Sequence, residues 1–366
     1  MTQATAKLDF PRTRSVLADA IAAHAFPGCA YGVFAAGEPV VIDSLGHFTY
    51  EPDSPAVQPD TVYDVASLTK VVVTTALAML HYQHGHLDLE QPLGDLLPGF
   101  VVGREPGSPA RLVTLRHLLA HNSGLPGYVE FYHAAHTPAA LFRACLELPI
   151  EAKPGTRAEY SDPGFILLGK DLEVLKHEHL ATWSRRELFE TLGMTHTGFC
   201  PPTALRALIS PTELDSTLRM RPIQGEVQDE NAWILKGAAG HAGLFSNVPD
   251  LLLFAAEVLA AARGNGCIFD ASTIELFSRR QVPPTGCRAL GWDTPSPSSS
   301  AGSHFSPHSI GHLGYSGCSL WIDLDAHVAA VLLTNRTWPD RKSQLIREIR
   351  PAFHDAVRRE LGSISL

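Results

Sequence analysis

A serine and a lysine three residues apart, Ser67 and Lys70, stand just before an apolar run that covers residues 71–80. Side chains at this spacing lie on the same face of a helix. A serine hydroxyl is a poor nucleophile until a nearby base takes its proton, and a lysine is such a base when its surroundings lower its pKa. The pattern therefore indicates nucleophilic catalysis, although the start of a helix with a solvated lysine has the same sequence.

Two later segments carry further groups that could take part in this chemistry. Tyr160 and Asp162 precede an apolar run at residues 165–168, in a context typical of a turn that leads into a helix. His312 and Gly314 precede residues 317–323, which have the composition of a strand. The chain thus contains three motifs, Ser-x-x-Lys, Tyr-x-Asp and His-x-Gly, in a fixed order.

With these motifs the chain resembles the serine hydrolases of the class C β-lactamase and penicillin-binding protein superfamily, whose three motifs meet around one cleft. Residues 114–126 and 240–246 also match supporting phrases of that family, and the resemblance covers about residues 15–340. It implies an α/β fold with a mainly antiparallel sheet flanked by helices, an inserted all-helical subdomain, and an active site between the two.

The resemblance also assigns roles to individual residues. Ser67 attacks a carbonyl carbon and forms an acyl-enzyme, and Lys70, if burial beside other positive groups keeps it neutral, removes the serine proton. Tyr160 shares that task or passes the proton to the leaving group, so the identity of the general base stays open. The backbone N–H groups of Ser67 and Tyr315 would stabilise the oxyanion, and Gly314 suits a strand that a substrate or backbone approaches closely.

Two positions depart from the β-lactamase pattern. His312 stands where true β-lactamases and transpeptidases usually have lysine, and a mostly neutral histidine holds a substrate carboxylate less firmly. Asp162 replaces an asparagine, and a carboxylate cannot donate a hydrogen bond to a substrate carbonyl. Both changes favour an esterase or amidase over an efficient β-lactamase. Asp162 could equally cap the helix that begins near Pro163.

A narrower resemblance connects residues 211–213, 225–232 and 291–296 with a bacterial subgroup that includes N-acetylmuramoyl-L-alanine amidases of cell-wall recycling. It implies cleavage of the amide between a lactyl group and a peptide. The residues that it adds as candidates for the cleft, each of which could instead be a buried hydrogen-bonding residue, are Asp229, Glu230 and His241. Arg157 could contact an anionic substrate or lie in solvent.

The predicted function is therefore hydrolysis of an ester or amide through an acyl-enzyme, with a muramyl-peptide as the candidate substrate. One alternative is a promiscuous carboxylesterase with weak β-lactamase activity. An alternative of another class is a sensor of peptidoglycan or β-lactams that acylates and stops. A third, a histidine-based metallohydrolase, would lose activity with a chelator.

Composition is consistent with a globular enzyme. The chain has 366 residues, of which 45% are hydrophobic and 18% charged. Its formal charge of −9 argues against nucleic-acid binding, and it contains no apolar stretch long enough for a membrane span. The first 25 residues lack the pattern of a signal peptide, so we expect a cytoplasmic protein. The oligomeric state stays open.

Neither the histidines nor the cysteines indicate a cofactor. The six cysteines are scattered without metal-site spacing, and we expect them to be reduced. His117 and His121 have the i, i+4 spacing of a helical metal site, but in the resembled family this segment is structural. We therefore expect no metal and no organic cofactor.

The elements that must position these residues can be outlined from the sequence. Two apolar runs around Gly37 predict a β-hairpin, and the Ser67 helix ends near Gly85. Proline, glycine and aspartate gather at residues 91–109, and strand patterns return at 309–324 and 328–334 before a closing helix near 341–361. The predicted organisation is an α/β domain formed by residues 1–98 and 226–366, interrupted by a helical subdomain at 99–225.

Overall fold

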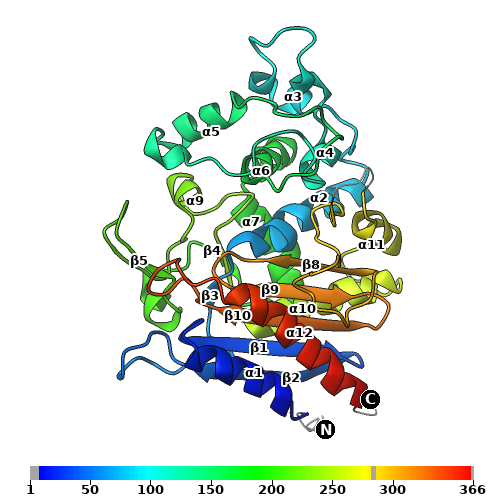
Figure 1. Ribbon diagram of the computed structural model, residues 1–366. Coiled ribbons are helices and arrows are strands. Elements are labelled where there is room, and N and C mark those ends of the chain that lie inside the picture. The colour runs from blue at the N-terminus through cyan, green and yellow to red at the C-terminus, as the bar shows by residue number, and fades with distance from the viewer. Residues whose placement is uncertain (1–7, 282–285, 364–366) are drawn as a thin grey trace.

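The computed structural model describes residues 8–281 and 286–363. Its main sheet has five antiparallel strands in the order β2-β1-β10-β9-β8 (Figure 1). The strand bounds are β1 Gly28–Ala35, β2 Glu38–Gly46, β8 Ser309–Leu313, β9 Ser319–Asp323 and β10 Val328–Thr334. The first hairpin pairs with the last strand, Cys29 opposite Thr334, so the two ends of the chain form one sheet and the predicted α/β class is confirmed.

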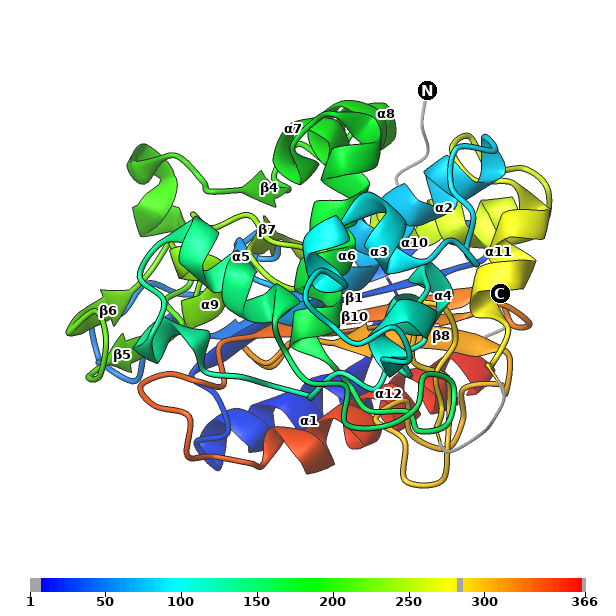
Figure 2. The same ribbon diagram turned by 90° about the horizontal axis from the view of Figure 1, so that it is seen from above.

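Helices cover both faces of this sheet (Figures 1 and 2). In β10 the side chains of Ala329, Val331 and Leu333 face one hydrophobic cluster, and those of the alternate residues face the other. Helices α1 (Pro11–Ala22) and α12 (Ile346–Ser363) lie together on one face, and α10 (Val248–Ala262) packs on the opposite face. Burial on both faces explains why β10 is apolar at almost every position.

A largely helical region lies above the sheet in Figure 1. Its helices are α3 Leu93–Leu96, α4 Leu115–Leu119, α5 Pro138–Leu146, α6 Asp162–Lys176, α7 Leu180–Ser184, α8 Glu190–Leu192 and α9 Glu230–Ile234. The short strands are β3 Tyr63–Asp64, β4 Gly198–Phe199, β5 Glu213–Asp215, β6 Arg221–Ile223 and β7 Leu244–Ser246. The boundaries at residues 98 and 225 remain predictions.

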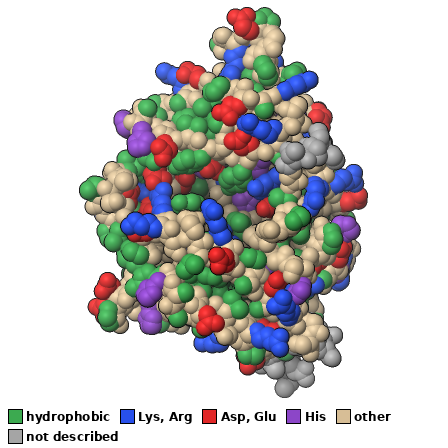
Figure 3. All heavy atoms as spheres, viewed as in Figure 1, with side chains coloured by type: hydrophobic (Ala, Val, Ile, Leu, Met, Phe, Trp, Pro, Cys, Tyr) green, Lys and Arg blue, Asp and Glu red, His purple; other side chains and the backbone are tan. Residues whose placement is uncertain are grey.

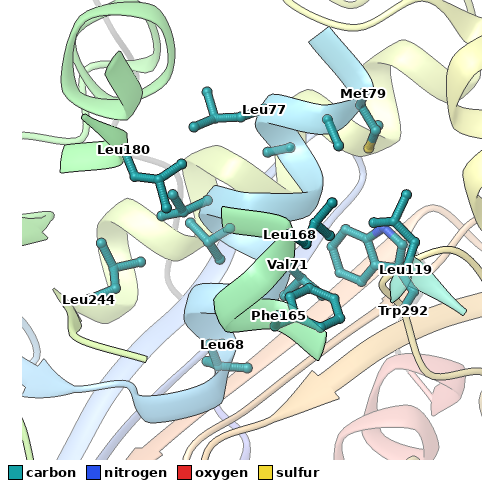
Figure 4. Packing of buried hydrophobic residues seen from close by; sticks show 14 of the residues in the cluster. Leu68, Val71, Leu77, Met79, Leu119, Phe165, Leu168, Leu180, Leu244 and Trp292 are labelled. Atoms are coloured by element: carbon teal, nitrogen blue, oxygen red, sulfur yellow. The ribbon is translucent and has the colours of Figure 1, made fainter. Parts of the chain in front are cut away.

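The segment that carries Ser67 lies between the sheet and the helical region. It begins as a 3₁₀ turn at Ala66–Leu68, continues as a π-helical stretch at Lys70–Thr75 and becomes α2 at Ala76–Gln83. Its apolar side chains are buried against α6 and α7, and the first of them pack around Phe165 (Figure 4). The predicted single helix is thus present, with an irregular start of a kind that is frequent at functional sites.

Two helices differ from the prediction. The closing helix begins at Ile346 rather than near Arg341, and the Arg341 guanidinium pairs with Glu213 and Glu230. Helix α11 (Ala271–Ser278) had no counterpart in the prediction. Among the described residues, no helix combines the length and the apolar character that crossing a membrane requires.

Candidate active site

A cavity of about 730 Å³ opens between the helical region and the end of the main sheet, where the surface is hollowed and charged side chains gather (Figure 3). Residues of all three sequence motifs line it: Ser67, Tyr160, Asp162, His312, Gly314 and Tyr315. A volume of this size fits a small molecule or a short peptide. The three motifs therefore meet in one place, as the resemblance implied.

Ser67 is presented by a sharp turn. Ala66 has a φ of 47°, a left-handed conformation that costs energy for a residue with a side chain. The buried Asp64 stabilises the turn, because its carboxylate accepts hydrogen bonds from the Ala66 N–H at 2.8 Å and from the Gln228 N–H at 2.7 Å. The strained backbone leaves the Ser67 side chain partly exposed to the cavity.

Lys70 is fully buried behind the serine, and its ammonium has three close acceptors. Its Nζ lies 3.0 Å from the Ser67 Oγ and 3.0 Å from the His241 carbonyl oxygen. It also lies 2.7 Å from Oδ1 of Asp162. An ammonium has three N–H donors and no lone pair, so this arrangement matches protonated Lys70.

The sequence led us to expect a neutral Lys70 amine beside other positive groups. The structure instead places negative groups beside Lys70. Burial alone would lower the pKa of Lys70, but the charge of Asp162, followed by that of Tyr160, outweighs burial and raises the pKa above its ordinary value. In the resting site Lys70 therefore donates to Ser67 and has no free lone pair that could take the serine proton.

The loop at residues 240–244 brings the His241 carbonyl to Lys70. It is wedged between the Ser67 segment and α6, where Gly240 lies so close to Phe165 that a Cβ would come within 2.2 Å of the Phe165 carbonyl oxygen. The Thr74 hydroxyl donates to the Gly240 carbonyl at 2.6 Å and fixes the loop from the other side. Only glycine permits this contact, which explains why the family-like segment 240–246 begins with glycine.

Asp162 does not cap its helix. The cap of α6 is Ser161, whose Oγ accepts a hydrogen bond from the Gly164 N–H at 3.1 Å. Asp162 occupies the first helical position, and its carboxylate turns to Lys70. The capping alternative for Asp162 is therefore wrong, because the neighbouring serine already provides the acceptor.

Tyr160 is held by His121, which the sequence analysis considered only as half of a possible metal pair. The rings of His121 and Tyr160 lie 4.6 Å apart, and Nδ1 of His121 accepts a hydrogen bond from the Ser161 N–H at 3.0 Å. The Tyr160 phenol is hydrogen-bonded to Lys70 and Ser67. Burial raises the pKa of Tyr160, and Asp162 adds to this effect while Lys70 opposes it.

The third motif lies at the end of β8, the edge strand. Nδ1 of His312 is 2.9 Å from the Leu313 carbonyl, which accepts its proton, so Nε2 is the unprotonated nitrogen. Burial, with Lys70 and Arg288 nearby, holds the pKa of His312 well below its usual range, so it contributes no positive charge at neutral pH. Gly314 packs against backbone, since a Cβ there would lie 2.4 Å from the Val65 carbonyl oxygen.

The two N–H groups expected to bind an oxyanion are available. Within the described part of the chain, the backbone N–H groups of Ser67 and Tyr315 donate no hydrogen bond. Both residues line the cavity. Two free donors beside the serine are what a tetrahedral intermediate requires.

The remaining predicted residues fall into two groups. Asp229 and Glu230 line the cavity, but each has a partner: Asp229 lies 2.9 Å from Nε2 of the buried His241, and Glu230 lies 2.7 Å from Arg341. Burial would raise the pKa of Asp229, yet His241 lowers it to about 2. Arg157 is outside the cavity lining and pairs with Glu151 and Glu159 on the surface.

Five arginines on the cavity wall were missed in the sequence: Arg288, Arg336, Arg341, Arg347 and Arg350. No motif marks them, because the fold gathers them from two separate segments. The same cavity is lined by five carboxylates, so its wall carries both charges: Glu130, Asp162, Asp229, Glu230 and Asp293. Among the described residues, no three histidine, cysteine, aspartate or glutamate side chains are grouped so that they could hold a metal ion.

Comparisons with known proteins agree with this geometry. The family model described as Beta-lactamase matches residues 13–351. The N-acetylmuramyl-L-alanine amidase of Bacillus subtilis (strain 168) is 30% identical over 307 residues, which cover 75% of this chain and 68% of the amidase. A Salmonella paratyphi B protein named as a D-alanyl-D-alanine carboxypeptidase is 30% identical over 76% of this chain and 70% of its own length.

Solved structures share the fold. EstCE1, a hydrolase with promiscuous acyltransferase activity, superposes with a TM-score of 0.77 at 21% identity over 95% of this chain and 98% of its own. The octameric penicillin-binding protein homologue from Pyrococcus abyssi gives a TM-score of 0.74 at 21% identity, over 97% of this chain and 78% of its own. The match of the family model over most of the chain shows that this protein is a serine hydrolase of the β-lactamase family.

Proposed function

We propose that this protein hydrolyses an amide or ester of a cell-wall-derived muramyl-peptide through an acyl-enzyme on Ser67. The observation that carries the proposal is the continuous contact from the Ser67 Oγ through the Lys70 ammonium to the Asp162 carboxylate, beside the Tyr160 phenol. The amidase name of a relative 30% identical supports the muramyl-peptide as substrate. The unpaired cysteines support a cytoplasmic location, where thiols stay reduced.

The protons carried by Lys70 and Tyr160 suggest how Ser67 is activated. Lys70 and Tyr160 contact each other and Ser67, so they titrate as a coupled pair. Loss of one proton from this pair creates the base that takes the Ser67 proton. The serine oxygen then attacks the carbonyl carbon, the N–H groups of Ser67 and Tyr315 hold the oxyanion, and Tyr160 returns a proton to the leaving group. Water hydrolyses the ester intermediate by the same steps.

This mechanism predicts a pH effect of Asp162→Asn. The Asp162 carboxylate raises the pKa of both Lys70 and Tyr160, so its removal lowers both and lets the base form at lower pH. We expect the rising limb of kcat/KM against pH to move to lower pH. The measurement is the pH profile for a p-nitrophenyl ester. The control is Asp340→Asn, which changes a partly exposed aspartate that pairs with Lys342 outside the cavity lining. A limb that stays in place or moves up contradicts the mechanism.

The substrate proposal is tested by offering the purified protein a muramyl-peptide, a short-chain ester and a chromogenic cephalosporin side by side. We expect release of free peptide from the muramyl-peptide, with steady turnover. Turnover of the ester alone would support the carboxylesterase alternative instead. A burst of acylation without turnover on every compound would support a sensor.

The second and third motifs favour an ester or amide over a β-lactam. The neutral His312 supplies no cation for the carboxylate of a β-lactam, and Asp162 supplies no amide donor for its acyl side chain. We therefore expect the cephalosporin to be the poorest of the three substrates.

A further inference from the structure

One residue, His121, holds the backbone on both sides of Tyr160. The Glu159 N–H donates to the His121 carbonyl oxygen at 2.7 Å, and the Ser161 N–H donates to Nδ1 of the His121 ring at 3.0 Å. The centre of this ring lies 4.6 Å from that of the Tyr160 ring and 4.8 Å from that of the Phe165 ring. His121 therefore fixes both the path of the chain through Tyr160 and the surface against which the phenol ring lies.

The hydrogen bond to Ser161 requires a neutral His121 that carries its hydrogen on Nε2. Nδ1 accepts this bond, so Nδ1 itself has no hydrogen. Burial, followed by the charges of Arg288 and Lys70, holds the pKa of His121 well below its usual range. The ring therefore stays neutral at neutral pH, and Nδ1 remains an acceptor.

Two features of His121 cost the fold stability. Its φ is 54°, a left-handed conformation that is unfavourable for a residue with a side chain. The residue is only 2% exposed, and within the described part of the chain its Nε2 has no hydrogen-bond partner. A buried donor without a partner also costs free energy. Strain of this kind persists most often at functional sites, where it serves to hold a group in place.

We propose that His121 is a positioning residue, whose Nδ1 bond to the Ser161 N–H holds the Tyr160 phenol where it returns a proton to the leaving group. This inference rests on the proposed function, in which Tyr160 gives that proton. The phenol is hydrogen-bonded to Lys70 and Ser67. A displacement of about 1 Å from such a geometry can lower a rate by about 100-fold. Loosening the backbone at Tyr160 would therefore weaken proton transfer without removing any reacting group.

Two esters with the same acyl group separate proton return from other effects. p-Nitrophenolate is a weak base and leaves without a proton, whereas phenolate is more basic and gains more from receiving one. The kcat/KM of phenyl acetate should therefore depend more strongly on the Tyr160 proton than that of p-nitrophenyl acetate. A variant that only loosens the fold lowers both values by the same factor.

We expect His121→Phe, which keeps a ring but has no acceptor, to lower kcat/KM for phenyl acetate by about 10-fold to 100-fold more than for p-nitrophenyl acetate. His121→Asn also carries an acceptor on Cγ and tolerates a left-handed backbone, so it should keep the ratio of the two values within about threefold of the wild type. The matched control is His177→Phe, because His177 is exposed, has a φ of 55° and lies outside the cavity lining. It should change neither value.

The outcomes separate this inference from the proposed function. If Tyr160→Phe leaves the ratio unchanged, Tyr160 does not give the proton and the proposed mechanism itself fails. If Tyr160→Phe changes the ratio but His121→Phe affects both esters equally, or neither, positioning by His121 is overturned. A change with His121→Asn as large as that with His121→Phe overturns the role of the Nδ1 bond. Should His121→Phe not fold, His121→Gly fits the left-handed backbone and lacks the acceptor, so it must shift the ratio in the same direction.

Discussion

Replacing Ser67 by alanine is expected to lower kcat for every ester or amide substrate by about 10⁴-fold to 10⁶-fold, because no other group in the cavity replaces the attacking oxygen. The fold should persist, since the serine side chain borders the cavity and water can take its place beside Lys70. The measurement is release of p-nitrophenol from a short-chain ester, together with the thermal unfolding midpoint.

Ser15→Ala removes an exposed hydroxyl on α1 and controls for hydrolysis by the protein surface. It should leave kcat unchanged. If Ser67→Ala keeps more than about a tenth of the wild-type kcat, Ser67 is not the nucleophile.

Replacing Lys70 by methionine is expected to reduce both activity and stability. Activity should fall by about 10²-fold to 10⁴-fold, the usual contribution of a positioned acid or base. The free energy of unfolding should fall by about 3 to 5 kcal/mol, because the Asp162 carboxylate, 15% exposed, would lose its partner in a buried place. Denaturant unfolding and ester hydrolysis measure the two effects separately.

The double variant Lys70→Met/Asp162→Asn separates chemistry from folding. It removes the stranded carboxylate, so most of the lost stability should return while activity stays low. Recovery of activity along with stability would show that Lys70 serves the fold rather than the reaction.

The parts of the site that lie close together in sequence could be predicted. Ser67 and Lys70 are one helical turn apart, so their contact follows from helix geometry alone. The hairpin of β1 and β2 follows from two apolar runs around Gly37, and the buried β10 follows from its almost continuous apolar sequence. The meeting of the three motifs came from the resemblance to a family and not from spacing.

The charges of the site could not be predicted, because they depend on side chains from distant segments. The carboxylate beside Lys70 is that of Asp162. From the sequence, Asp162 was equally suited to cap the helix, but the structure shows that Ser161 is the cap. His121 supports Tyr160 from a segment forty residues earlier. Arg288 reaches the cavity from a loop without a sequence motif. Long-range packing decides all three.

The most direct test of the central claim, that Lys70 and its neighbours make the Ser67 hydroxyl a nucleophile, is to trap the acyl-enzyme. The protein is mixed with an ester substrate, quenched in acid within the first turnovers, and digested for peptide mass mapping. We predict that the acyl mass is found on the peptide containing Ser67, at an amount that falls when Lys70→Met is used. An acyl group on another residue, or turnover with no acylated protein at any time, would contradict the account.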